Sequence, residues 1–156
     1  MPTIWKSAIW FPFAVGGAVL GAAWVAERLP QPRLRERGRA DSVLGAALVL
    51  ALYALTAALR HQPATVSVVL TAAIAVGVWA WWDPSPRAFA VAAGAAIAGP
   101  LGEIVIVKAG AASYAPDADG LFGVAPWLPF LYFAAGAVAS GLWAAVSRGA
   151  RTSPPS

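Results

Sequence analysis

Glu103 is the one ionisable residue inside a long apolar stretch, and it lies in the segment Gly99-Pro100-Leu101-Gly102-Glu103. An ionisable side chain in hydrocarbon costs at least about 2.5 kcal/mol, so it is a candidate functional group. Pro100 has no backbone N–H and leaves a helix carbonyl without its partner, and the glycines loosen the helix. A carboxyl and carbonyls in one cavity could bind the polar group of a ligand or carry a proton. The alternative is a neutral, hydrogen-bonded packing residue.

Asp83 follows another apolar stretch and is itself followed by Pro84 and Pro86. The local explanation is a helix stop, because prolines disfavour continued helix and an aspartate readily turns the chain. The chain has no cysteine and a single histidine, His61, which excludes thiolate and histidine-rich metal sites. Glu103 has no acidic or histidine partner within any apolar stretch. The sequence therefore predicts no catalytic site, no metal site and no cofactor.

The composition predicts a membrane protein. Of the 156 residues, 60% are hydrophobic and 12% are charged, whereas an average soluble domain has roughly 25% charged residues. Five of the eleven basic residues lie between Arg28 and Arg39, with an apolar run on either side. This arrangement is typical of a membrane loop and not of a nucleic-acid-binding surface.

The elements that position these residues are expected to be transmembrane helices. Crossing about 30 Å of hydrocarbon takes about 20 apolar residues. Five stretches meet this requirement, and the prolines near 126 place the start of the last one. The predicted fold is all-α, a polytopic bundle of five transmembrane helices in a single membrane domain over residues 1–156, with spans at about 7–26, 42–59, 64–82, 88–107 and 126–147.

The loops between these spans divide the positive charge unequally. One side holds Lys6, Arg60 and Lys108, and the other holds eight arginines: Arg28, Arg33, Arg35, Arg37, Arg39, Arg87, Arg148 and Arg151. The positive-inside rule then places the N-terminus outside and the C-terminus in the cytoplasm.

Small residues recur one helical turn apart in these spans, as in the pairs Gly17/Gly21 and Gly136/Ser140. Such faces let helix backbones approach closely. They fit packing inside one bundle or, alternatively, a homo-oligomer.

Five stretches resemble, in the same order, the insulin-induced gene (Insig) proteins, which are membrane regulators of sterol metabolism. Residues 7–12 resemble the family's SAWWVPP, and a basic loop follows in both. Residues 70–83 resemble LTLAALSIGLWWTFD, and residues 89–114 fit the next span without a gap. Tyr114, Pro116 and Asp117 resemble YTSPD. Residues 127–136 are close to WLPCIFFAGG. The ordered set covers nearly the whole chain.

The resemblance implies a non-enzymatic bundle that binds a lipid within the membrane. Eukaryotic members bind oxysterols and then hold partners such as Scap and HMG-CoA reductase. Asp83 matches an aspartate that faces the protein partner, and Trp79 matches a tryptophan of the lipid pocket. Val66 stands where the sterol-binding members have a pocket glutamine. The family has six spans, and the first would precede Ser7.

Nine arginines against two lysines indicate a bacterial chain, so an inner-membrane location is expected and the eukaryotic partners are not carried over. The protein partner stays unknown. Two functions remain open. The first is an Insig-like protein that binds a diacylglycerol- or sterol-like lipid, with Trp79, Val66, Pro100 and Glu103 at the lipid. The second is a small proton-coupled transporter or a ligand carrier of the translocator-protein type, which the proline at 100 and the carboxyl of Glu103 favour.

Overall fold

The computed structural model describes residues 21, 28, 39–110, 113 and 120–152. The expected first span, residues 7–26, therefore lies outside the described residues except for Gly21, as do Gly17 and residues 114–119. The regular secondary structure of the described residues is helical, apart from one isolated bridge between Leu121 and Val124. Its elements are α3 (Arg39–Ala58), η1 (Leu59–His61), α4 (Ala64–Trp82), α5 (Pro86–Lys108) and α6 (Leu128–Thr152).

Helix boundaries follow local sequence signals. Helix α4 ends at Trp82, because Asp83 leaves the helical backbone region, with φ −156° and ψ 90°, and a proline follows. Helix α5 starts at Pro86, a residue suited to a first helical position. The Ser85 hydroxyl caps this helix by accepting a hydrogen bond of 3.0 Å from the backbone N–H of Ala88. The expected helix stop at Asp83 is therefore confirmed.

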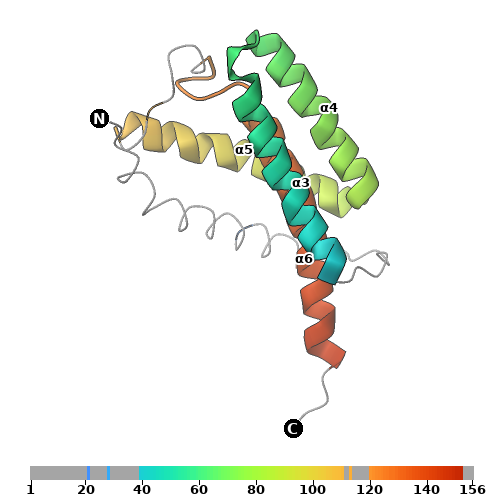
Figure 1. Cartoon of the computed structure of the whole chain (residues 1–156). Helices are drawn as coiled ribbons and strands as arrows, with labels where there is room; N and C mark the ends of the chain where they lie inside the picture. Colours follow the sequence, from blue (N-terminus) through green and yellow to red (C-terminus); the bar gives the residue numbers. More distant parts are fainter. Residues whose placement is uncertain (1–20, 22–27, 29–38, 111–112, 114–119, 153–156) are drawn as a thin grey trace, which may run out of the picture.

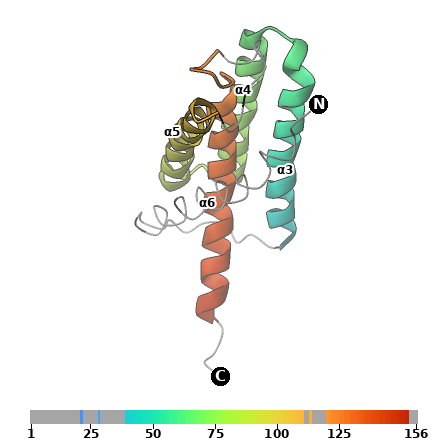
Figure 2. The same cartoon turned by 90° about the vertical axis from the view of Figure 1, so that its left-hand side faces the viewer.

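Helix α6 lies at the centre of the described bundle. It packs most extensively against α5, then against α4, and less against α3. In Figure 2, α3, α4 and α6 run roughly alongside one another, and α5 lies on the other side of α6. Figure 1 shows that α4 and α5 diverge from the turn that joins them, and that the C-terminal part of α6 extends beyond the other labelled helices.

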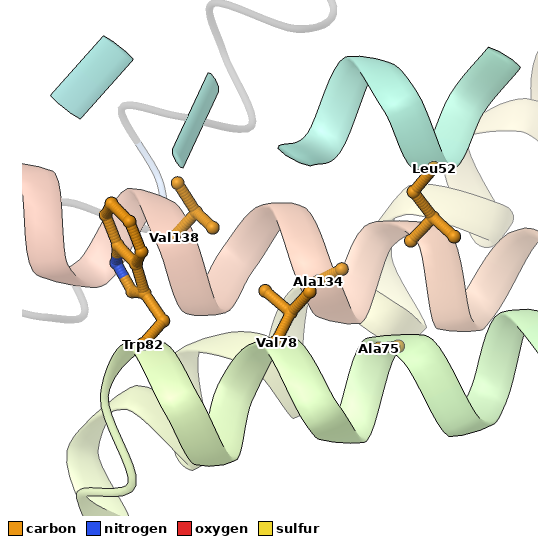
Figure 3. Close-up of a cluster of buried hydrophobic side chains, with 6 residues drawn as sticks. All are labelled: Leu52, Ala75, Val78, Trp82, Ala134 and Val138. Atoms are coloured by element: carbon orange, nitrogen blue, oxygen red, sulfur yellow. The ribbon is translucent and has the colours of Figure 1, made fainter. Parts of the chain in front are cut away.

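The interior of the bundle is small and apolar. Buried side chains from α3, α4 and α6 form one cluster: Leu52, Ala75, Val78, Trp82, Ala134 and Val138. Figure 3 shows Trp82 reaching from α4 toward α6, at one end of this cluster. Alanines dominate the fully buried positions of α5 and α6. Close helix packing through small residues is typical of membrane bundles.

Large apolar side chains cover the outside of the helices. Val43 on α3, Val69 on α4 and Ile97 on α5 are each more than half exposed. Helices α4 and α5 are long and apolar enough to cross a membrane, while the apolar parts of α3 and α6 are shorter, at Val43–Ala58 and Leu128–Leu142. The helical fold is thus established, and a fivefold crossing stays a prediction.

Candidate functional site

Glu103 is held by a tyrosine from the central helix. The Tyr132 hydroxyl on α6 donates a hydrogen bond of 3.0 Å to Oε1 of Glu103 on α5. Both side chains are half-buried. This contact joins residues 29 positions apart, so it fixes α5 against α6 as well as satisfying one carboxyl oxygen.

The backbone around Pro100 is shaped to receive this tyrosine. The ring of Tyr132 lies against Gly99, where an added Cβ would overlap it. Pro100 itself is buried, and α5 continues through it to Lys108. Because a proline has no N–H, the carbonyl four residues earlier, at Ala96, lacks its helical partner. The expected helix irregularity is therefore a missing hydrogen bond within a continuous helix.

Trp79 begins a row of aromatic rings that crosses three helices. Its ring lies edge-on to Phe89 of α5, with centroids 5.5 Å apart, and Phe89 lies edge-on to Phe133 of α6 at 5.7 Å. Phe89 is 49% exposed, so the row opens onto the outside of the bundle. The Trp79 Nε1 atom is buried, and no acceptor lies within hydrogen-bond distance of it among the described residues.

The four residues expected at a lipid do not converge on one point. About four turns of α5 separate Phe89, the partner of Trp79, from Glu103, a distance of about 21 Å at 1.5 Å per residue. Val66 lies in the first turn of α4, about 20 Å along that helix from Trp79, and is 39% exposed. Pro100 and Glu103 share one region of α5, while Trp79 lies near the opposite end of the bundle.

Asp83, which the resemblance marks as partner-facing, is buried in the structure. It is 3% exposed, and its Oδ1 accepts a hydrogen bond of 3.1 Å from the backbone N–H of Ser85. This hydrogen bond ties the carboxylate to the turn between α4 and α5. Arg87, only 4% exposed, enters α5 four residues later. Sequence reasoning counted this arginine as a loop charge and missed its burial. The capping serine at 85 and the proline at 86 signal only that the helix begins before Arg87.

Comparison with known proteins finds one similar sequence and two similar structures. No protein-family model matches it. The sequence is 39% identical, over 99% of this chain and 76% of the relative, to an INSIG protein homologue of Mycolicibacterium vanbaalenii.

Two solved structures are also similar. The crystal structure of a mycobacterial Insig homologue from Mycobacterium vanbaalenii gives a TM-score of 0.83 at 37% identity, over 95% of this chain and 78% of that one. The crystal structure of a cross-linked trimer of that homologue, which carries a cysteine substitution, gives a TM-score of 0.83 at 34% identity, over 99% of this chain and 80% of that one. With its apolar helices, the chain is therefore an integral membrane protein that belongs to the Insig family.

Proposed function

We propose that this protein binds an amphiphilic lipid, diacylglycerol- or sterol-like, against helices α4, α5 and α6. The observation that carries the proposal is the buried Trp79 indole N–H without an acceptor among the described residues. A buried donor left unpaired costs about 1–3 kcal/mol. A lipid ester carbonyl or hydroxyl beside the exposed ring of Phe89 would accept this hydrogen bond, while the apolar part of the lipid covers the ring.

Glu103 supplies a second polar contact near the other end of α5. Its Oε1 already accepts the Tyr132 hydroxyl. We propose that this carboxyl also binds a polar group of the lipid, because a carboxyl oxygen can take part in more than one hydrogen bond. The distance of about 21 Å between the two regions suits an elongated amphiphile or two separate lipids. Pro100 lies in the same region of α5 as Glu103. We propose that Val66 contacts the apolar part of the lipid.

We expect Trp79→Phe to lower lipid retention about fivefold, because it keeps an aromatic ring and removes one hydrogen bond worth about 1 kcal/mol. Glu103→Leu should also lower retention, and Glu103→Gln should leave it near normal because the amide keeps a donor and an acceptor. The measurement is native mass spectrometry of protein purified from its membrane, with the retained lipid quantified.

Trp81→Phe is the matched control, since Trp81 lies two positions after Trp79 in the same helix and is 60% exposed. It should retain lipid like the parent. Equal losses for the changes at Trp79 and Trp81, or no loss for either, would refute the role of the Trp79 N–H. The transporter would be favoured by two results together. Glu103→Gln would lower lipid retention, and the parent would show proton-coupled flux in proteoliposomes that this variant abolishes.

We also propose that the protein is non-catalytic and assembles with copies of itself. The related Insig homologue was crystallised as a cross-linked trimer, and the apolar outer surface of this bundle offers large contact areas. The same mass spectra report the oligomeric state, and a monomer at every protein concentration in mild detergent would contradict assembly.

We propose further that the protein lies in a bacterial inner membrane with its C-terminus in the cytoplasm. Gln62, between η1 and α4, then faces outward, and Pro84, between α4 and α5, faces the cytoplasm. Because the chain has no cysteine, Gln62→Cys and Pro84→Cys each introduce a single thiol at an exposed position. In intact cells an impermeant maleimide should label the first and not the second, and lysis should expose both. The reverse pattern would invert the topology.

A further inference from the structure

A tight turn precedes α6 and presents an aromatic ring. The backbone N–H of Leu121 donates to the Val124 carbonyl at 2.9 Å, and the N–H of Val124 donates to the Leu121 carbonyl at 3.1 Å. The two residues between them, Phe122 and Gly123, have φ of 55° and 93°. Two positive φ values inside a pair of reciprocal hydrogen bonds resemble a type I′ hairpin turn.

Phe122 is an unfavourable residue for its position. Left-handed backbone costs roughly 1–2 kcal/mol for a residue with a Cβ, and turns of this kind prefer asparagine or aspartate before glycine. The side chain is also 78% exposed, the most exposed of the large apolar residues in the described chain, whereas Val124 and Ala125 are fully buried. The ring therefore contributes little to the protein interior and needs another explanation.

The turn lies at the depth where the α5 span ends. A Cβ on Gly123 would lie 3.4 Å from Cγ1 of Val107, in the last turn of α5 before the exposed Lys108. On the other side of the turn, Trp127 immediately precedes α6. Figure 2 shows this orange segment near the ends of both helices. Lysines and tryptophans at span ends are typical of the boundary between headgroups and acyl chains.

We propose that Phe122 is a membrane anchor whose ring inserts into the headgroup–acyl boundary of the leaflet at the Lys108 end of α5. The buried Val124 and the reciprocal hydrogen bonds already fix the turn with the ring exposed. Insertion therefore costs little additional conformational entropy. The apolar outer surface of α5 reaches almost to this level, because Val105 is 66% exposed one turn before the helix ends. Lys108 and Trp127 at the same level are typical of the lipid boundary, and they favour lipid over a second protein copy as the occupant. The proposal does not depend on lipid binding at Trp79.

The first test measures depth directly. Phe122→Cys and Gly120→Cys would each carry an environment-sensitive fluorophore, in vesicles of phosphatidylcholine with bromine atoms on the acyl chains. Gly120 is the control because it is exposed in the same loop, and the nearest atom to an added Cβ there is 3.9 Å away. We expect at least twofold stronger bromine quenching at position 122 than at 120. Equal, weak quenching at both would overturn the proposal.

The second test separates anchoring from folding. Phe122→Asn suits the turn better but removes the ring, so thermal stability in detergent should not fall. In vesicles, a fluorophore at Gly120→Cys should become at least twofold more accessible to aqueous iodide when Phe122→Asn is added. Phe122→Trp should restore the parent value. Unchanged iodide access, or rapid disulfide cross-linking between two copies of Phe122→Cys, would reject the lipid anchor, and the cross-link would identify a second copy as the occupant.

Discussion

Trp82→Ala should lower the free energy of unfolding by about 3 kcal/mol, within the range for tryptophan truncation in packed cores. Trp82 is 2% exposed, and its ring lies between α3 and α6 at a point where each of these helices has a glycine. A Cβ on Gly45 of α3 would lie 2.5 Å from its ring carbon Cη2, and one on Gly141 of α6 would lie 2.6 Å from its Nε1. Lipid chains are as apolar as the core, so the loss comes from packing contacts more than from exclusion of water.

The measurement is reversible unfolding in mixed micelles of a mild detergent and sodium dodecyl sulfate. Trp81→Ala is the matched control, because Trp81 is adjacent in sequence, lies in the same helix turn and is 60% exposed. Its stability should change by less than about 0.5 kcal/mol. If the two substitutions destabilised the protein equally, the packing of Trp82 between α3 and α6 would be wrong.

Local signals made several helix boundaries predictable from the sequence. The third expected span, 64–82, covers the same residues as α4, since Pro63 precedes it and Asp83-Pro84 follows it. The last span was expected from Pro126, but α6 begins at Leu128, because residues 121–127 form the bridged turn and its continuation. The sequence did not predict the turn at residues 121–124, because phenylalanine before glycine is not a usual signal for positive φ.

Contacts between distant residues were beyond sequence reasoning. The spacing around Glu103 indicated a polar group that needs a partner, but nothing near it in sequence pointed to Tyr132. Likewise, Trp79 and Glu103 were both expected at the lipid, but about four turns of α5 separate Phe89, the partner of Trp79, from Glu103. Periodicity identifies a helix and its polar positions. The side of α6 on which each neighbouring helix packs depends on side-chain shapes that the pattern does not encode.

Gly136 shows how a small residue decides that packing. From the sequence, the Gly136/Ser140 pair could pack within the bundle or between copies of the chain. The structure places both residues in the interior. A Cβ on Gly136 would lie 2.8 Å from Cβ of Ala95 and 2.9 Å from Cα of Ala92, so the backbones of α5 and α6 meet there. Alanine at this position would push the two helices apart.

Gly136→Ala should therefore destabilise the protein by about 1–3 kcal/mol, the usual cost of overpacking a closely packed interior. Gly94→Ala in α5 is the matched control: the position is helical and exposed, and an added Cβ there has no neighbour within 4 Å. Alanine is the better helix former by up to about 1 kcal/mol, so this control should not lose stability. The two changes add the same methyl group and should have opposite signs in the micelle unfolding assay, because only Gly136 lies where two backbones touch. Equal stabilisation by both would show that α5 and α6 do not approach each other at this glycine.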